Sequence, residues 1–370
     1  MARLQAALPK RHYVEPAGFA AEREQVLARE WFCAGRVDDL GLDLPGRLAV
    51  LDVLGESVLV ARLRNGNLAA HYNVCRHRGS QLVPVPPGEP PPGPRAAAAL
   101  RCPYHSWTYD LSGALLRAPY TEDVDGFAPE QFGLHPLGAA TWAGFLFVHL
   151  TPAEAVPLAA SLGAVPERLC RYPLDRLRTG RRLGYDVAAN WKLICENYNE
   201  CYHCAGVHPE LCRLVPAFAR GGRNLAWESG IPHREGTWTF TADGTSTRSA
   251  FPDLDDDERV RHKGELVYPN LLLSLSADHV AAFTLWPLGH DRTRIVCDLL
   301  FAPTEIACDS FDPSDAAEFW DLVNRQDWAV CESVQRGMSS RAYQQGWFAP
   351  MEDESLDIRR WLLPRLERRS

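Results

Sequence analysis

The sequence lacks long hydrophobic runs, long basic runs and a recognisable export signal. Its most apolar stretch, LLLSLSADHVAAFTLW, is interrupted by Asp278 and His279, so no segment reaches the roughly 20 residues that cross a membrane as a helix. Lysine and arginine total 39 against 47 acidic residues, a net charge of −8, which argues against a basic surface for nucleic acid. The N-terminus has only a short apolar patch before a proline, unlike a signal peptide. These absences predict a cytoplasmic protein that binds neither membranes nor nucleic acid.

The cysteines do not suggest a disulfide framework. There are 11 of them, an odd number, scattered along 370 residues. Small secreted domains instead carry dense, even-numbered cysteine patterns. Metal binding and simple burial therefore both stay open for these thiols.

Turn and strand signals divide the chain into two regions, as its length also suggests. Residues 17–33 predict a helix, and residues from about 45 to 150 predict short antiparallel strands separated by turns. Within this region, the proline-rich residues 84–99 predict an exposed loop. After residue 151, strands mix with helices, including a long helix at about 314–337. The predicted fold class is α+β.

The first group of candidate metal ligands lies in the predicted β region. CRHRG contains Cys75 and His77, and CPYHSW contains Cys102 and His105. Two thiolates and two imidazoles fit a tetrahedral structural zinc site. They also fit a [2Fe–2S] cluster in which two cysteines hold one iron and two histidines hold the other. Each half here supplies one cysteine and one histidine. This favours the cluster, since zinc knuckles more often pair cysteine with cysteine and histidine with histidine.

The second group lies in NECYHCAGVHPE, residues 199–210. His203 and His208 are five residues apart, about 500° of rotation on a regular helix, so they would point to different faces. Both can bind one metal only if the helix breaks between them. Gly206 followed by Pro209 is a sequence at which such a break is expected.

A third ligand is available on the long helix at 314–337. One stripe of that helix, at steps of three and four, comprises Phe319, Val323, Asp327, Val330 and Val334. A buried, unpaired carboxylate is costly, so Asp327 needs a partner, either a metal or a basic side chain. Two histidines and one aspartate form the facial triad of non-haem Fe(II) oxygenases. A zinc site that includes Cys201 and Cys204 is the alternative, although their spacing also suits ordinary packing.

These motifs resemble those of a known family. CRHRG and CPYHSWTYDLSG resemble the two halves of the Rieske domain of ring-hydroxylating oxygenases, and NWKLICENYNECYHCAGVHPE and QDWAVCESVQRGMSS resemble their catalytic-domain motifs. The resemblance runs from about residue 13 to the end. The gap between His77 and Cys102 is longer than usual in the family and coincides with the proline-rich stretch, which we interpret as a loop insertion away from the cluster.

The resemblance implies a domain organisation and a set of ligands. Residues 1–39 would be a helical segment that packs with the catalytic domain, 40–150 the Rieske domain, and 151–370 a catalytic domain of helix-grip type. The implied ligands are Cys75, His77, Cys102 and His105 for a Rieske [2Fe–2S] cluster, and His203, His208 and Asp327 for a mononuclear Fe(II). Glu200 matches the carboxylate that, in the family, bridges the mononuclear site to a Rieske histidine of a neighbouring subunit. Glu196 lies on the same helical stripe, so either glutamate could be the buried one.

The resemblance also implies partners. Electron transfer between subunits suits a head-to-tail ring, which predicts a homotrimer. The chain has no GxGxxG fingerprint for a flavin or dinucleotide. Electrons from NAD(P)H would therefore come through a separate flavin and iron–sulfur reductase, with or without a ferredoxin.

The substrate prediction rests on finer similarity. EPAGFAAERE, NYNECYHC, YPNLLLSLS, LWPL and CESVQRGM resemble the branch that contains choline monooxygenase, carnitine oxygenase and glycine betaine demethylase. This implies N-demethylation or oxidation of a quaternary ammonium compound. Aromatic faces bind such cations, and the candidates on predicted strands are Trp238, Phe240, Phe283 and Trp286. The alternatives are hydroxylation of an aromatic or alicyclic substrate in catabolism or biosynthesis, a Rieske electron carrier, and a structural zinc protein.

Overall fold

The computed structural model describes residues 3–222 and 225–367, which form two compact units. The β unit spans Ala28–Ser161, and the α+β unit combines the residues up to Leu27 with those from Leu162 onward. The expected limits at residues 40 and 150 differ from these. Strand β2 (Phe32–Arg36) pairs with β11 (Phe145–His149), and the Trp31 indole donates a hydrogen bond to the Val156 carbonyl (2.8 Å), so both flanks belong to the β unit.

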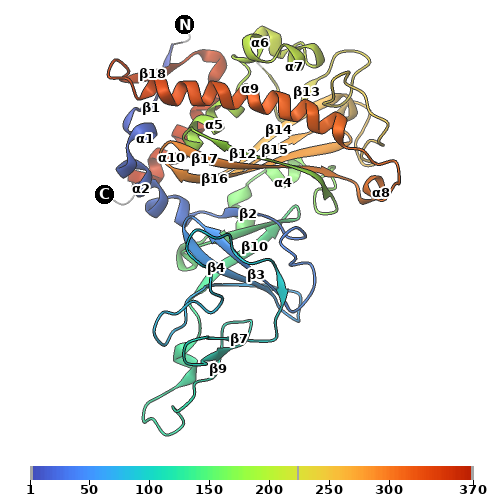
Figure 1. Cartoon of the computed structure of the whole chain (residues 1–370). Coiled ribbons are helices and arrows are strands. Elements are labelled where there is room, and N and C mark those ends of the chain that lie inside the picture. Colours follow the sequence, from blue (N-terminus) through green and yellow to red (C-terminus); the bar gives the residue numbers. More distant parts are fainter. Residues whose placement is uncertain (1–2, 223–224, 368–370) are drawn as a thin grey trace. The chain divides into compact units, whose positions relative to one another are not determined.

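The β unit contains two antiparallel sheets (Figure 1). The larger has the strand order β2-β11-β10-β5-β4-β3-β6 and the smaller has the order β7-β8-β9. The remaining strands are β3 (Arg47–Val53), β4 (Glu56–Arg62), β5 (Leu68–Tyr72), β6 (Arg95–Ala96), β7 (Leu100–Arg101), β8 (Thr108–Tyr109), β9 (Leu115–Arg117) and β10 (Pro136–Trp142). The proline-rich residues 84–99 are mostly exposed, as predicted, and contribute only the two-residue edge strand β6.

The α+β unit is built on one antiparallel sheet with the order β12-β17-β16-β15-β14-β13. Its strands are β12 (Arg178–Val187), β13 (Ile231–Pro232), β14 (Arg261–Val267), β15 (Leu271–Leu275), β16 (His279–Gly289) and β17 (Arg292–Phe301). The 25-residue helix α9 (Ser314–Met338) lies across this sheet, and α5 (Trp191–Tyr198) packs against it (Figure 1). The buried stripe of α9 runs through Val323 to Cys331 and Gln335, whereas Val334, predicted to be on it, is exposed.

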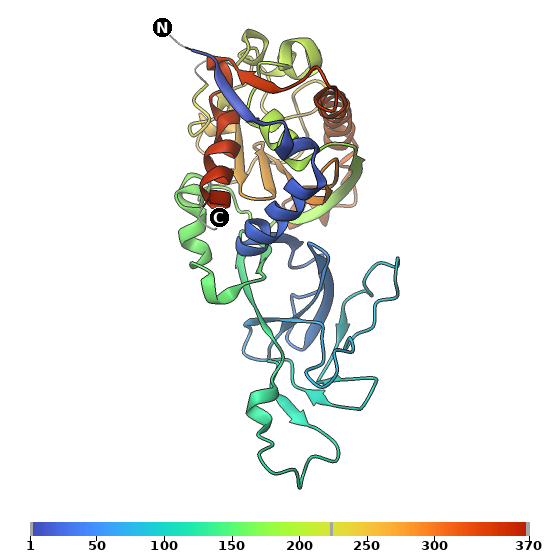
Figure 2. The ribbon, with the colours of Figure 1, turned by 90° about the vertical axis from the view of Figure 1, so that its left-hand side faces the viewer.

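The N-terminal segment belongs to the α+β unit. Strand β1 (Gln5–Pro9) pairs with β18 (Gln345–Phe348), and both run beside each other in Figure 2. Helix α2 (Pro16–Gln25) contacts α10 (Asp357–Glu367). Helices α1 (Arg11–Val14), α3 (Leu158–Leu162), α4 (Val165–Arg168) and α8 (Pro303–Ile306) are short. No helix in residues 3–222 or 225–367 combines the length and the apolarity that a membrane crossing requires.

A fully buried ion pair ties α2 to α5. The Lys192 ammonium lies 2.7 Å from a Glu22 carboxylate oxygen, and neither side chain is exposed. Burial would raise the pKa of Glu22, but the positive charge of Lys192 lowers it below its usual value. Burial lowers the pKa of Lys192, and the Glu22 carboxylate opposes that shift. Each group therefore favours the charged form of the other where the N-terminal segment meets α5.

Lys192→Met is expected to lower the free energy of unfolding by about 3–5 kcal/mol, because it leaves a buried carboxylate without its cation. Glu22 would keep only the weaker contact with the His12 ring, 3.4 Å away, among its described neighbours. The double variant Glu22→Gln/Lys192→Met should recover most of that loss in urea unfolding. Equal losses in the single and double variants would show that the charge itself is not what matters.

Candidate metal centres and active site

The two histidines of the second motif lie at the two ends of the short helix α6, His203 before it and His208 after it. Helix α5 ends at Tyr198, α6 covers only Cys204–Val207, and α7 (Pro209–Leu214) begins at the proline. His208, between α6 and α7, leaves the helical region with φ −121° and ψ 67°. The chain leaves the helix before Pro209, as predicted, whereas Gly206 lies inside α6. The two imidazole rings have a centroid distance of 5.2 Å.

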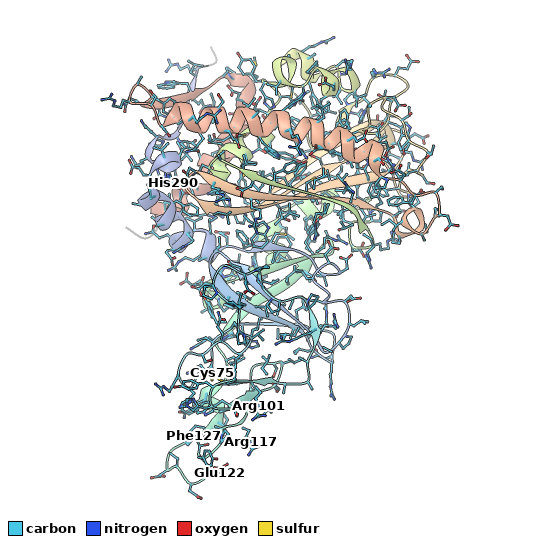
Figure 3. All side chains as sticks on the ribbon, viewed as in Figure 1. Cys75, Arg101, Arg117, Glu122, Phe127 and His290 are labelled. Atoms are coloured by element: carbon cyan, nitrogen blue, oxygen red, sulfur yellow. The ribbon has the colours of Figure 1, made fainter. Side chains whose placement is uncertain are left out.

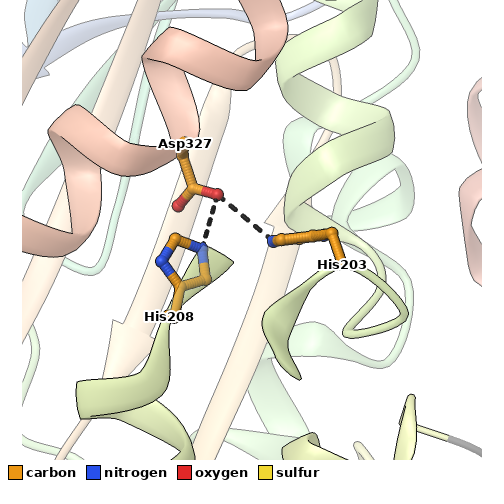
Figure 4. A group of neighbouring side chains, drawn as sticks. All are labelled: His203, His208 and Asp327. Atoms are coloured by element: carbon orange, nitrogen blue, oxygen red, sulfur yellow. Dashed lines mark hydrogen bonds and ion pairs between the residues drawn. The ribbon is translucent and has the colours of Figure 1, made fainter. Parts of the chain in front are cut away.

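Asp327 completes this group from helix α9 (Figure 4). Its Oδ1 atom lies 2.9 Å from Nε2 of His208 and 3.2 Å from Nε2 of His203. One donor atom from each of the three residues lies within 4.8 Å of the other two. Burial would raise the pKa of Asp327, but the two histidines lower it below its usual value, so the carboxylate is ionised. Two imidazoles and a carboxylate that converge on one point fit a mononuclear iron with open positions.

Each histidine is oriented through its other ring nitrogen. Nδ1 of His203 lies 2.6 Å from Oε1 of Glu200, and Nδ1 of His208 lies 2.7 Å from Oε1 of Gln326. Gln326 in turn donates to Glu210 (3.2 Å). Such contacts fix the ring orientation and leave Nε2 as the donor toward a metal. The sequence did not identify Gln326 or Glu210, although the position of Gln326 next to Asp327 was a signal.

The two glutamates predicted to share a helix stripe are separated, because α5 ends at Tyr198. Glu200 lies beyond the helix and contacts His203, whereas Glu196, on α5, does not. Glu196 accepts a 2.5 Å hydrogen bond from the Tyr13 hydroxyl, and burial raises its pKa to about 8. Tyr13 comes from the N-terminal segment, far away in the sequence. The structure therefore separates two residues that the helical period could not distinguish.

Cys201 and Cys204 are buried beside this group, but their sulfur atoms are not among the donor atoms that converge on one point. Cys204 Sγ lies 3.9 Å from Nε2 of His203, and within the described chain the set of mutually close donors comprises the two histidines and Asp327 alone. This arrangement supports the interpretation of both cysteines as packing residues.

The first motif supplies a second donor group, in the β unit, where Figure 3 labels Cys75. Cys75 and Cys102 are buried, whereas His77 and His105 are exposed with ring centroids 4.7 Å apart. Trp107 stacks on His77 at 5.0 Å. Buried thiols with exposed imidazoles fit a [2Fe–2S] cluster that has one buried and one accessible iron.

Tyr109→Phe is expected to lower the reduction potential of the cluster that this group would hold. The Tyr109 hydroxyl lies 3.3 Å from Sγ of Cys75, and a hydrogen bond to sulfur favours the more negative, reduced state. A net hydrogen-bond contribution of about 1 kcal/mol corresponds to a shift of about 40 mV for one electron. Spectroelectrochemistry measures it, with the exposed Tyr104→Phe as the control; identical potentials in both variants would contradict the assignment.

A cavity of about 610 Å³ lies against the histidine–aspartate group. Its aromatic lining consists of Tyr198, Phe218, Trp227, Phe240, Tyr268 and Trp320. Phe240 is the one residue of the four aromatic candidates from the sequence that lines it. Phe283 packs behind Trp320, at a centroid distance of 5.8 Å, while Trp286 projects from the opposite face of β16.

Trp238 also misses the cavity lining, because the strand predicted around it does not form. Residues 237–245 instead make turns stabilised by threonine side chains. The Thr237 hydroxyl donates to the Arg234 carbonyl (2.8 Å), and the Thr241 hydroxyl donates to the Thr245 carbonyl (2.7 Å). Hydroxyl groups that bond to nearby backbone in this way compete with strand pairing.

Trp320 is held in one orientation by a buried chain of hydrogen bonds. Its indole N–H donates to Nε2 of His279 (2.9 Å), and Nδ1 of His279 lies 2.8 Å from the Asp278 carboxylate. Because an indole can only donate, Nε2 of His279 must accept, which places the ring proton on Nδ1 toward Asp278. The sequence signal for Trp320 was its position seven residues before Asp327 on the same helix stripe.

Two family profiles match the chain. One, described as the catalytic domain of the ring-hydroxylating alpha subunit, matches residues 174–367, and the other, described as the Rieske [2Fe–2S] domain, matches residues 30–128. The chain belongs to the ring-hydroxylating alpha-subunit family of Rieske non-haem iron oxygenases. It is therefore an enzyme whose domains are those that carry a [2Fe–2S] cluster and a mononuclear iron, as predicted.

Several relatives of this Rieske oxygenase are similar over most of their length. The glycine betaine monooxygenase oxygenase subunit of Pseudomonas aeruginosa (strain UCBPP-PA14) is 31% identical, over 92% of this chain and 84% of the relative. The carnitine monooxygenase oxygenase subunit of Acinetobacter baumannii is 28% identical, over 90% of this chain and 86% of the relative. The solved structure of the quaternary ammonium Rieske monooxygenase CntA with L-carnitine has a TM-score of 0.73 at 25% identity, covering 98% and 96% of the two chains.

These findings confirm the predicted α+β fold and the predicted oxygenase class. The catalytic-domain match over residues 174–367 disfavours a bare electron carrier and a structural zinc protein, the two non-oxygenase alternatives. Rieske oxygenases act on small molecules and receive electrons from a separate reductase.

Proposed function

We propose that this chain is the oxygenase component that oxidises an N-methyl group of a small quaternary ammonium compound. The observation that carries the proposal is the aromatic lining of the cavity, in which Tyr198, Phe240 and Trp320 share one space with the His203–His208–Asp327 group. Aromatic faces attract quaternary ammonium cations. The similarity to oxygenase subunits named for glycine betaine and carnitine supports the same class of substrate.

We assign the metal ligands from the two donor groups. The proposed ligands are Cys75, His77, Cys102 and His105 for the [2Fe–2S] cluster, and His203, His208 and Asp327 for Fe(II). When bound, the cluster supplies electrons one at a time and the mononuclear iron supplies O₂ activation. Glu200 and Gln326 hold Nδ1 of the two histidines, so that both Nε2 atoms face the Asp327 carboxylate at the end of the cavity.

Within this cavity, the protein's own residues position the substrate. Trp320, fixed by His279, and Phe240 meet edge to face at 5.4 Å and form one wall for the ammonium group. Carboxylates that line the cavity, including Glu200 and Glu354, give it a negative potential that attracts a cation.

The proposed reaction balances as an N-demethylation. One O₂, two electrons and two protons are consumed; one oxygen atom enters a methyl C–H bond and the other leaves as water. The N-hydroxymethyl product then breaks its C–N bond, releasing formaldehyde, a tertiary amine and a proton. The electrons come from NAD(P)H through a flavin and iron–sulfur reductase, with or without a ferredoxin.

We further propose a homotrimer in the cytoplasm, with Glu200 linking two subunits. The contact of Glu200 with His203 Nδ1 (2.6 Å) supports a role between the mononuclear site and a Rieske histidine of the next chain. A head-to-tail ring provides such a junction at every interface. The odd number of cysteines, eleven scattered along the chain, suits a reducing compartment.

Formaldehyde release tests the proposed function. Metal-loaded protein with a surrogate reductase would be offered glycine betaine, carnitine, choline and stachydrine, beside a few aromatic acids. The proposal predicts formaldehyde and O₂ uptake that depend on an ammonium compound. Uptake of O₂ only with an aromatic acid, without formaldehyde, would instead support hydroxylation of an aromatic or alicyclic substrate.

A further inference from the structure

The described lining of the cavity has one cationic side chain among several carboxylates. Among the described residues that line it, Arg168 alone carries a permanent positive charge. The lining carboxylates are Glu200, Glu228, Glu265, Asp327, Glu354 and Asp357. Carboxylates and aromatic rings already suit a simple cation. The arginine therefore indicates that the ligand also carries an anionic group.

One side of the Arg168 guanidinium is fixed by Glu265. Nε and Nη2 donate to the two carboxylate oxygens of Glu265 at 2.5 and 2.8 Å. Arg168 ends helix α4 and Glu265 lies on strand β14, and the Glu265 side chain is only 11% exposed. The bidentate geometry orients the guanidinium plane and directs its remaining nitrogen, Nη1, away from Glu265.

The Nη1 group has a weaker partner. Oε1 of Glu228 lies 3.9 Å from it, beyond hydrogen-bond distance. The Glu228 side chain is 82% exposed and also lines the cavity. An exposed side chain at this distance can be displaced at small cost by a carboxylate that hydrogen-bonds Nη1 directly.

We propose that Nη1 of Arg168 binds the carboxylate of a zwitterionic substrate, and that Glu228 competes for this position in the free enzyme. The substrate is then a quaternary ammonium compound that carries its own carboxylate, with the ammonium group against Phe240 and Trp320. This inference rests on the proposed function and narrows it, because it separates betaine-like substrates from choline-like ones.

The competing interpretation is that Arg168 and Glu265 only join α4 to β14. A purely structural pair would affect all substrates alike when it is removed. Specific recognition of a carboxylate would affect only the substrates that carry one, because hydrogen bonds to charged groups change affinity by about 10- to 100-fold.

Glycine betaine and choline form the matched pair of ligands for the test, since both carry a trimethylammonium group and only the former has a carboxylate. The double variant Arg168→Gln/Glu265→Gln removes the charge without leaving an unpaired carboxylate. In the metal-loaded enzyme, the KM for glycine betaine should rise about 10- to 100-fold with a much smaller change in kcat, whereas the KM for choline should change little. Calorimetric titration of the oxidised holoenzyme should show the same difference in Kd.

A second variant acts in the opposite direction. Glu228→Gln, at an exposed position, should lower the KM for glycine betaine severalfold and leave that for choline unchanged or higher. Parallel changes for both ligands, or a wild-type preference for choline, would overturn this inference alone. If neither ligand nor any other ammonium compound binds or releases formaldehyde, the proposed function fails and the inference with it.

Discussion

Replacing Asp327 with alanine should remove the mononuclear iron and turnover while leaving the visible spectrum of the [2Fe–2S] cluster unchanged. The carboxylate contacts Nε2 of both His203 and His208, and without it two imidazoles remain, too few for a stable facial site. Iron content should fall from about three to about two atoms per chain, with two labile sulfides retained.

Asp321→Ala is the matched control for this experiment. Asp321 lies on the same helix, six residues earlier, and pairs with Arg325 at 2.7 Å on a more exposed face. The control should keep its full iron content and turnover. Turnover retained by Asp327→Ala, or cluster loss along with the mononuclear iron, would refute the assignment of Asp327 as a ligand of a separate site.

Glu200→Gln should abolish the coupling between the two metal centres while both remain filled. Loss of a partner that merely orients a histidine costs about 10- to 100-fold in metal affinity or activity. Replacing a residue that also lies on the electron-transfer path should lower activity further, and this loss should persist at saturating iron. The measurement is the rate at which the reduced cluster is reoxidised by O₂ in the presence of substrate.

Gln326→Ala provides the comparison, because Gln326 orients His208 as Glu200 orients His203. With iron saturating, this variant should reoxidise its cluster at close to the wild-type rate, whereas Glu200→Gln should be at least about a hundredfold slower. Equal rates in the two variants would reduce Glu200 to an orienting residue and remove the support for the subunit bridge.

Local sequence identified the metal-binding chemistry, because the ligands lie in short motifs. Cys75 and His77 are two residues apart in one motif, and the end of α6 at His208 is explained by the proline that follows it. Asp327 was recognisable as an acid on an apolar helix stripe. The rest of the buried stripe could not be predicted, because steps of three or four residues allow more than one next position. In the structure Cys331 is buried and Val334 is exposed.

Features that depend on distant segments could not be predicted. The Tyr13 hydroxyl decides that Glu196, and not Glu200, is the glutamate turned away from the histidines. Pairing of Phe32–Arg36 with a strand more than a hundred residues later moves the domain limit. The described wall of the cavity includes residues of α9, β14 and β15 but none of β16, so Trp286 on β16 was chosen where Trp320 on α9 lines the site.

A single-turnover experiment without any reductase tests the central claim most directly. Protein with both centres filled would be reduced chemically, freed of reductant and mixed with O₂ and glycine betaine or carnitine. The account predicts that the cluster is reoxidised and that formaldehyde forms in an amount approaching one molecule per filled site, only when the ammonium compound is present. Reoxidation of the cluster without formaldehyde, for every quaternary ammonium compound supplied, would contradict it.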